Sequence, residues 1–367
     1  MADYSWDMSL KIGIVGLPNV GKSTLFNALT KQAAKAQNVP FTTITPNVGV
    51  VAVPDDRLTK LTALSKSVKT TPTTIEFVDI AGLVKNAHQG EGLGNQFLAN
   101  IRAVNAIAHV VRFFDNSAII HVEQTVDPKR DVEIINTELI LADLAVVDKM
   151  RSNLDKKIRG NDKAAQALDV LLAKMSEHLN SNQPARTLSL TPEEVELSTT
   201  IPLLTGKPVL YIANVGDQQT SLSPDQLTAV FSPSDHVLPI SVKIEQELVQ
   251  LPDEERLIFL HEYGLEQTGL DRLIQASYSL LNLITFFTSG PTESRAWTVP
   301  RGAFAPQAAG QIHSDMERGF IRAETVVYDD LISAGSHAAA RSAGHVRDEG
   351  KTYLVQDGDV MFFKFSA

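Results

Sequence analysis

Residues Gly16 to Thr24 read Gly-Leu-Pro-Asn-Val-Gly-Lys-Ser-Thr and directly follow the apolar run Lys11-Ile12-Gly13-Ile14-Val15. This is the spacing of a phosphate-binding P-loop, a glycine-rich turn between a strand and a helix. The backbone N–H groups of such a turn point at phosphates, and the following helix, expected over Ser23 to Lys35, adds the positive end of its dipole. The stretch therefore predicts a nucleotide site.

The P-loop also supplies side chains for phosphoryl transfer. Lys22 is expected to reach the β- and γ-phosphates, where its charge supports both binding and catalysis, and Ser23 is expected to ligate Mg²⁺. The residues predicted to contact the nucleotide from this loop are Asn19, Val20, Gly21, Lys22, Ser23 and Thr24.

Two downstream segments complete the predicted phosphate and metal site. The segment 38–46 contains Pro40 and Pro46, which exclude a regular helix, and its hydroxyl for Mg²⁺ is expected to be Thr43, with Thr42 as the alternative. The β-rich run 74–78 ends in Asp79-Ile80-Ala81-Gly82. We expect Asp79 to hold Mg²⁺, directly or through water, and the Gly82 N–H to sense the γ-phosphate.

An apolar residue, Leu83, stands where Ras-like enzymes carry the glutamine that orients the attacking water. Because an apolar side chain cannot orient water, either hydrolysis is intrinsically slow or another group enters the site. The nearby candidates are His88, Gln89, His109 and His121, of which His109 lies inside an apolar run and is expected in the core.

Two later strand ends predict the base-binding side of the site. The run 207–213 ends in Asn214-Val215-Gly216-Asp217, and the run 237–240 ends in Ser241-Val242-Lys243. Guanine-specific enzymes carry Asn-Lys-x-Asp and Ser-Ala-Lys at these places. Here Val215 replaces the lysine while the acid Asp217 remains, and a plain turn is the alternative reading. The residues expected to contact the base are Asn214, Val215, Asp217 and Ser241.

Between these motifs, apolar residues from 131 to 179 recur at helical spacing and form one face on each of two long helices. Gly160-Asn161-Asp162 marks the turn, so we expect an antiparallel helical arm inserted into the nucleotidase domain. Residues 149–163 carry six basic and two acidic side chains. This tip is either a phosphate-contacting surface or a solvated helix end.

From residue 283 onward the pattern changes to short strands and turns, which predicts a small α+β domain. Strands are expected at 283–287, 296–299, 325–327, 353–355 and 360–365, with one helix at 336–343. Four arginines, Arg295, Arg301, Arg318 and Arg322, predict a local RNA-binding face, and a structural module that binds nothing is the alternative.

Composition limits the partners of the chain. The net charge of the 367 residues is -10, so contact with nucleic acid must be local, and no general DNA binding is expected. There is no cysteine and no apolar run near the roughly 18 residues needed to span a bilayer. We therefore expect a soluble cytoplasmic protein without a membrane partner.

The motifs together resemble the Obg-like ATPase (YchF) family from about Met8 to the end of the chain. The resemblance rests on the P-loop, on the blocks 41–44 and 79–84, and on two family-specific blocks at 90–95 and 307–313. It implies an α/β fold: a Ras-like P-loop nucleotidase domain (8–130 and 204–282), an inserted helical coiled-coil arm (131–203) and a C-terminal β-grasp (TGS) α+β domain (283–367).

The resemblance also implies a function. It indicates a slow ATPase, with ATP favoured over GTP, that acts as a switch on ribosomes or ribosomal subunits through the arm and the TGS domain. It places a proposed catalytic histidine at His121, and it suggests K⁺ near Asn19 in addition to Mg²⁺. The alternatives are a GTPase, since Asp217 stands where the family usually shows Glu, or a nucleotide-dependent RNA- or ribosome-binding module in which hydrolysis is incidental.

Overall fold

The computed structural model describes residues 10–35, 47–80, 93–116, 121–217, 221–262 and 265–366. The chain divides into two compact units. One contains the described parts of Leu29–Glu76 and Leu260–Ala367, and the other those of Lys11–Ala28 and Phe77–Phe259. The boundaries predicted for the three domains stay a prediction.

The second unit is built on parallel strands. β1 (Lys11–Val15), β5 (Ala106–Arg112), β6 (Val209–Asn214) and β7 (His236–Ile240) lie next to one another in that order. Every residue of β5 and β6 is buried, as expected for parallel strands covered on both faces. The carboxyl ends of these strands meet at one edge, which is where α/β proteins place their ligands.

Two further strands belong to this sheet, β2 (Val48–Ala52) and β4 (Thr74–Asp79). The full strand order is β2-β4-β1-β5-β6-β7. The strand order and the P-loop agree with a Ras-like nucleotidase fold. Its helices are α1 (Lys22–Lys35), α3 (Leu93–Arg102), α7 (Pro224–Val230), α8 (Val242–Leu248), α9 (Asp253–Glu262) and α10 (Gly269–Leu280).

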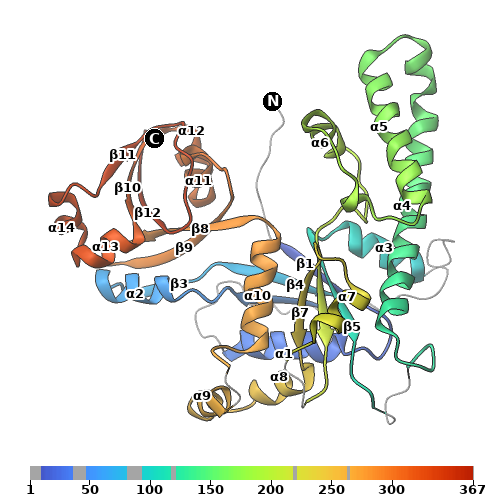
Figure 1. Ribbon diagram of the computed structural model, residues 1–367. Coiled ribbons are helices and arrows are strands. Elements are labelled where there is room, and N and C mark those ends of the chain that lie inside the picture. The colour runs from blue at the N-terminus through green and yellow to red at the C-terminus, as the bar shows by residue number, and fades with distance from the viewer. Residues whose placement is uncertain are drawn as a thin grey trace. The chain divides into compact units, whose positions relative to one another are not determined.

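The predicted arm is present as two long helices, α4 (Pro128–Arg159) and α5 (Lys163–Asn180), which lie side by side (Figure 1). The turn falls at residues 160–162, where the Asp162 side chain caps α5 by accepting the backbone N–H groups of Ala164 and Ala165. Apolar side chains of both helices share one core. A short helix, α6 (Pro192–Ser198), and a 3-10 turn, η2 (Ala185–Thr187), follow.

The base of the arm is fixed by a buried carboxylate. Asp143 of α4 accepts the backbone N–H groups of Leu204 and Thr205, both at 2.8 Å, and the Thr205 hydroxyl at 2.7 Å. Burial raises the pKa of Asp143, and these hydrogen bonds oppose that shift. The contacts join α4 to the segment that leads back into β6.

The C-terminal domain is a second sheet, with strand order β11-β10-β12-β8-β9-β3. Five strands come from the last 85 residues of the chain, but β3 (Lys69–Thr71) comes from the nucleotidase sequence and pairs in parallel with β9 through Thr70 and Ser294. The other strands are β8 (Leu283–Ser289), β9 (Glu293–Pro300), β10 (Phe320–Val327), β11 (Arg347–Glu349) and β12 (Asp359–Phe365).

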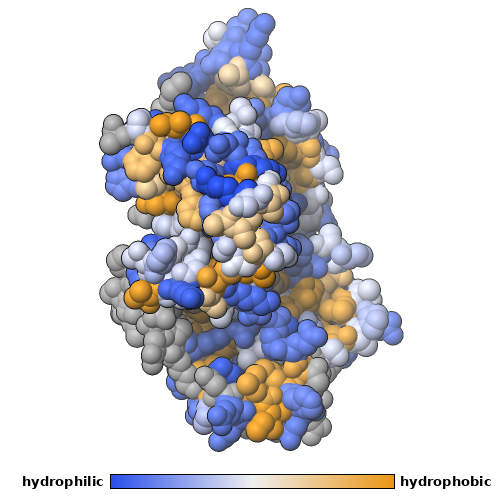
Figure 2. Space-filling model, turned by 90° about the vertical axis from the view of Figure 1, so that its left-hand side faces the viewer, coloured by the Kyte–Doolittle hydropathy of each residue, from blue (hydrophilic) through white to orange (hydrophobic). Residues whose placement is uncertain are grey.

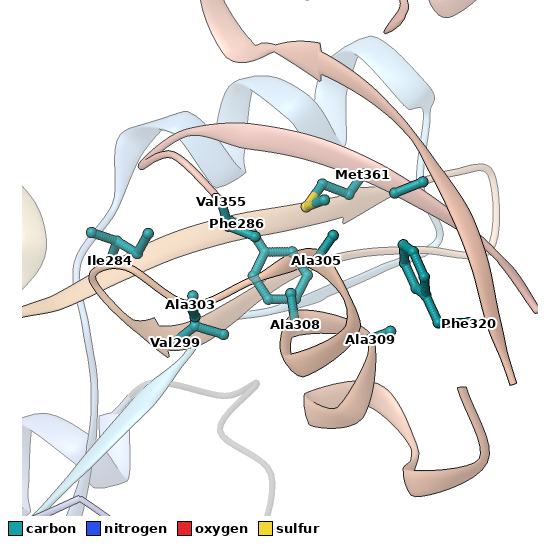
Figure 3. Close-up of a cluster of buried hydrophobic side chains, with 11 residues drawn as sticks. Ile284, Phe286, Val299, Ala303, Ala305, Ala308, Ala309, Phe320, Val355 and Met361 are labelled. Carbon is teal, nitrogen blue, oxygen red and sulfur yellow. The ribbon is translucent and has the colours of Figure 1, made fainter. Parts of the chain in front are cut away.

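Each face of this sheet has its own hydrophobic core. On one face Phe286 of β8 projects toward the alanines of α11 (Ala305–Ile312), as Figure 3 shows. On the other face α2 (Asp56–Ser65) places Leu58 and Leu61 against Phe287 and Val360. Residues 56–71 therefore cover and extend a sheet that is more than 200 positions away in the sequence.

The predicted strand at 353–355 is wrong, since only an isolated bridge joins Leu354 to Phe304. The reason is the partner segment: the Tyr353 carbonyl oxygen accepts the Ala305 backbone N–H at 2.9 Å and the Val355 backbone N–H donates to Ala303 at 3.0 Å, but α11 begins at Ala305, so the pairing cannot continue. In the C-terminal domain, the helices that the sequence pattern did not predict are α11, α12 (Ser314–Arg318) and α13 (Tyr328–Ala334), whereas α14 (His337–Ser342) was expected.

Hydrophilic and hydrophobic residues are intermixed over the face shown in Figure 2. Among the described residues, no helix is both long enough and apolar enough to cross a membrane.

Candidate nucleotide site

The P-loop connects β1 to α1 and requires glycine at two positions. Gly16 has φ +152° and Gly21 has φ +106°, a region that side chains rarely allow. A Cβ atom on Gly16 would lie 2.5 Å from the carbonyl oxygen of Val110, and one on Gly21 would lie 2.5 Å from Nδ2 of Asn214. The contacts of the loop with β5 and β6 therefore require glycine at these two positions, independently of any phosphate binding.

Lys22 is buried at the start of α1. Its Nζ donates to the Leu17 carbonyl oxygen at 2.7 Å, so the ammonium group lies across the loop. Burial lowers the pKa of Lys22 to about 8, while the charge of Asp79 opposes this shift. The positive charge of Lys22 is therefore only partly balanced by Asp79, and the negative charge of a bound polyphosphate would stabilise it further.

Ser23, in the first turn of α1, forms a hydrogen bond with Asp79, the last residue of β4. Burial raises the pKa of Asp79, whereas the Lys22 charge and a hydrogen bond with Ser23 oppose the rise. A hydroxyl and a carboxylate are the oxygen ligands that Mg²⁺ prefers. Thr43 and Gly82, the other residues predicted for the metal and the γ-phosphate, lie outside the described residues, as do Leu83, His88 and Gln89.

Within the described part of the chain, no group of three or more His, Cys, Asp or Glu side chains could hold a metal ion by itself. Mg²⁺ in nucleotide sites is commonly held by one or two protein oxygens together with phosphates and water. The pair of Ser23 and Asp79 fits that kind of site.

Asn214 connects the P-loop to the base-binding side. Its Nδ2 donates to the carbonyl oxygen of Val20 at 2.8 Å, and its Oδ1 accepts the backbone N–H of Val242 at 3.1 Å. The side chains of Val20 and Val215 are buried. Asn214 thereby fixes the distance between the P-loop and the loops that follow β6 and β7.

A pocket of about 460 Å³ opens beside these loops. Asp217 and Lys243 form an ion pair at this pocket, and the Ser241 hydroxyl lies 3.4 Å from Oδ1 of Asp217. The pocket is adjacent to the P-loop, so its size and position suit the base and ribose of a nucleotide. The residues that line it include Asn19, Thr24, Phe114, Val215, Asp217 and Lys243.

His121 contacts the first turn of α4. Its ring is buried, with Nε2 2.8 Å from Oδ2 of Asp131 and Nδ1 accepting the Glu123 backbone N–H at 3.1 Å. His109 is buried in β5, where burial lowers its pKa to about 3. The expectation that His109 belongs to the core is confirmed.

Lys243, Phe114 and Asp131 are among the residues of this region that were not predicted as site residues. Lys243 had a signal, because it ends a Ser-x-Lys motif after a strand. Phe114 and Asp131 had none, since nothing in the local sequence shows that Phe114 reaches the pocket or that Asp131 meets His121.

The predicted basic surfaces differ in how far their charges are already paired. On the arm, the side chains of Lys156, Lys157 and Arg159 are exposed at the end of α4. In the C-terminal domain Arg318 pairs with Asp315 and Arg322 with Asp348, and Arg295 lies over the Trp297 ring at 4.0 Å.

Comparisons with known proteins cover 98% of the chain. A family model of the YchF GTPase C-terminal region, described as a protein of unknown function, matches residues 283–366, and one described as a 50S ribosome-binding GTPase matches residues 11–141. The ribosome-binding ATPase YchF of Bacillus subtilis is 52% identical over 365 residues, which is 98% of this chain and 100% of the relative.

The ribosome-binding ATPase YchF of Escherichia coli O157:H7 is 51% identical over 362 residues, with the same two coverages of 98% and 100%. Among solved structures, the YchF GTPase of Schizosaccharomyces pombe matches with a TM-score of 0.88 and 38% identity, covering 97% of this chain and 98% of that one. The similarity thus includes the nucleotide site, the arm and the C-terminal domain.

Proposed function

The chain belongs to the YchF family, and we propose from this membership and from the site that it is a slow ATPase that acts as a ribosome-associated switch. The observation that carries the proposal is the P-loop, whose buried Lys22 lies beside Ser23 and Asp79 at the end of the parallel sheet. This arrangement suits the binding and charge stabilisation of a transferred γ-phosphoryl group.

The proposal gives each predicted site residue a role. The backbone of residues 19–24 surrounds the phosphates, Lys22 neutralises their charge, and Asn214, Val215, Asp217 and Ser241 face the base and ribose. ATP is favoured over GTP because Val215 stands in place of the lysine of guanine-specific sites. His121 is the proposed group that polarises the attacking water, in place of the absent glutamine.

The metal ions enter the proposal through oxygen ligands. Ser23 and Asp79 are the described residues that would hold Mg²⁺, with Thr43 as a further oxygen ligand, and the Gly82 N–H would donate to the γ-phosphate. Bound there, Mg²⁺ would neutralise phosphate charge. Asn19 is proposed to place a K⁺ ion that supplies further positive charge. Turnover that is equal in Na⁺ and in K⁺ would contradict the potassium part.

The ribosome is the proposed partner, as the printed names of the two bacterial relatives state for those proteins. The nucleotide would occupy the domain 8–130 and 204–282, while the arm (131–203) and the C-terminal domain (283–367) would contact ribosomal RNA. Since the net charge of -10 repels a polyanion over most of the protein, contact must concentrate on the basic tip of the arm and on the arginines of the C-terminal domain. A ribosomal partner also implies a cytoplasmic location.

Cosedimentation with ribosomes, together with ATP turnover with and without ribosomes, tests the proposal. We expect binding to differ between a non-hydrolysable ATP analogue, ADP and no nucleotide, and we expect ribosomes to stimulate turnover. Changing Lys156, Lys157 and Arg159 to Glu should abolish cosedimentation at physiological salt, because repulsion replaces counterion release at the arm.

A matched control changes three exposed lysines away from the arm, Lys31, Lys60 and Lys66, to Glu, which alters the net charge by the same amount. This variant should still bind ribosomes. Equal loss in both variants would mean that only total charge matters and would contradict a role for the arm. Ribosome binding without any stimulation of turnover would instead favour the binding module in which hydrolysis is incidental.

A further inference from the structure

A buried arginine ends the strand β5 beside the base pocket. Arg112 is 1% exposed and is among the largest fully buried side chains of the protein. It is paired with Asn214 of the neighbouring strand β6, and Phe113 donates its backbone N–H to the Asn214 carbonyl oxygen at 2.8 Å. The sheet therefore places Arg112 at the edge where the nucleotide is proposed to bind.

The guanidinium group of Arg112 contacts the segment that follows its own strand. Its Nε donates to the carbonyl oxygen of Phe114 at 3.1 Å, and its Nη2 donates to that of Asn116 at 3.2 Å. Its Cζ lies 4.4 Å from the centre of the Phe114 ring, so the cation also contacts the aromatic side chain. Because a buried charge must keep its hydrogen bonds, these contacts fix the backbone of 114–116 together with the ring.

Residues 114–116 form part of the wall of the base pocket. Phe114, Asp115 and Asn116 all line it, together with Asn19 of the P-loop and the segment 214–217. The side chain of Phe114 is only partly buried. Its ring is therefore available to a ligand in the pocket, whereas Arg112, which holds the ring, is closed off from solvent.

An aromatic ring in the wall of a nucleotide pocket suits the flat face of a base. Stacking on such a ring is possible for every base, because every base has a π-face. A ring that is already held in one orientation loses less conformational freedom when the base binds. The contacts with Arg112 supply this preorganisation before a nucleotide enters.

We propose that Arg112 is a positioning residue, which holds the Phe114 ring as a stacking surface for a purine base without touching the nucleotide itself. This inference rests on the proposed nucleotide binding and names a residue that acts through the wall of the same site. Stacking does not read the hydrogen-bonding groups of a base, so Arg112 contributes about equally to the binding of adenine and guanine nucleotides.

The test measures the binding of three ligands to the full-length protein with Mg²⁺: the non-hydrolysable analogues of ATP and GTP, by titration calorimetry, and inorganic tripolyphosphate, by displacement of the ATP analogue. Arg112→Met removes the donors and the charge and keeps a long side chain. We expect it to weaken both analogues at least fivefold, with the ratio of their dissociation constants within twofold of the wild type. Tripolyphosphate has no base, so its affinity should stay within twofold.

Arg112→Lys is the second variant, used also if Arg112→Met does not fold. It keeps the charge and loses the planar group that makes both backbone contacts at once. It should weaken both analogues at least threefold and leave tripolyphosphate unchanged. Arg341→Met is the matched control, since Arg341 is a 56% exposed arginine of α14 that pairs with Glu324 in the C-terminal domain. Its three affinities should equal those of the wild type.

A thermodynamic cycle tests whether Arg112 acts through the ring. Phe114→Ala removes the stacking surface and should weaken both analogues at least as much as Arg112→Met does. Once the ring is absent, adding Arg112→Met should weaken them by less than a further twofold. Losses that multiply in the double variant would show that Arg112 acts independently of Phe114 and would overturn the inference.

The outcomes separate this inference from the proposed function. Unchanged affinity for both analogues in the Arg112 variants would overturn the role of Arg112, as would a loss confined to one analogue or an equal loss for tripolyphosphate. In each of these cases the nucleotide site itself would stand. Failure of the wild-type protein to bind either analogue would instead overturn the proposed function.

Discussion

Nε2 of His121 lies 2.8 Å from Oδ2 of Asp131, and each of the two side chains is 2% exposed. The other ring nitrogen, Nδ1, accepts the backbone N–H of Glu123. A nitrogen that accepts a hydrogen bond carries no proton, so Nε2 is the donor to Asp131. Both nitrogens are thus used within the protein, and Asp131 belongs to the first turn of the arm helix α4.

If His121 polarises the attacking water, replacing it with Ala should lower ATP turnover at least tenfold and leave ATP affinity near that of the wild type. The reason is that general acid–base groups commonly contribute rate without contributing to ground-state binding. Single-turnover hydrolysis and calorimetric titration measure the two quantities. Unchanged turnover would mean that His121 has no catalytic role and only packs against the arm helix α4.

Replacing Asp131 with Ala should raise basal turnover about threefold or more, because His121 can reach water only after it leaves this carboxylate. The double variant of His121 and Asp131 should be as slow as the His121 variant alone, which a thermodynamic cycle of turnover rates would show. Asp148→Ala, at an exposed position of the same helix, is the control. If the Asp131 variant is as slow as the His121 variant, Asp131 does not hold His121 away from the attacking water.

The pKa of Lys22, about 8 in the free protein, predicts a pH dependence of nucleotide affinity. Below this pH the lysine is charged and ready for phosphate, whereas above it binding must take up a proton. The dissociation constant for an ATP analogue should therefore rise between pH 8 and 9.5, by up to about tenfold per pH unit when one proton is taken up. Lys22→Arg keeps its charge and should show no such slope. A flat wild-type profile would contradict the lowered pKa of Lys22.

Gly21→Ala should weaken nucleotide binding more than tenfold. A positive φ costs a non-glycine residue about 1 to 2 kcal/mol, and the added methyl group would also meet Nδ2 of Asn214. The matched control is Gly290→Ala, since no atom lies within 4 Å of a Cβ built there. If Gly21→Ala binds nucleotide as well as the control does, the contact with Asn214 does not shape the loop.

Leu61→Ala should lower the free energy of unfolding by about 2 to 5 kcal/mol, because Leu61 is fully buried and packs α2 on the C-terminal sheet. Urea unfolding in a Trp6→Phe background, followed by the fluorescence of Trp297, which lies in β9, reports on that sheet. Leu257→Ala, at an exposed leucine of α9, should change the stability by less than about 0.5 kcal/mol. A similarly small effect at Leu61 would mean that α2 does not support the sheet.

The geometry of the P-loop was predictable because the loop is local in the chain. The two glycines, Lys22 and Ser23 are fixed by spacing within nine residues, and Asp79 by its place at the end of an apolar run. The arm was predictable for a similar reason, since the helical period of its apolar residues and the capping residue Asp162 are both short-range signals. The failed strand at 353–355 shows the limit, because its partner residues lead into the helix α11, which no pattern within 353–355 reveals.

By itself the sequence determined the P-loop, the arm and the family, because each depends on residues close together in the chain or on identity along its whole length. Only the tertiary structure decided that residues 56–71 cover and extend the C-terminal sheet, that His121 is held by Asp131, and that Lys243 pairs with Asp217. These contacts join positions separated by 10 to more than 200 residues. No local pattern specifies such pairs, because what selects them is the burial and charge neutralisation that appear once the strands and helices have packed.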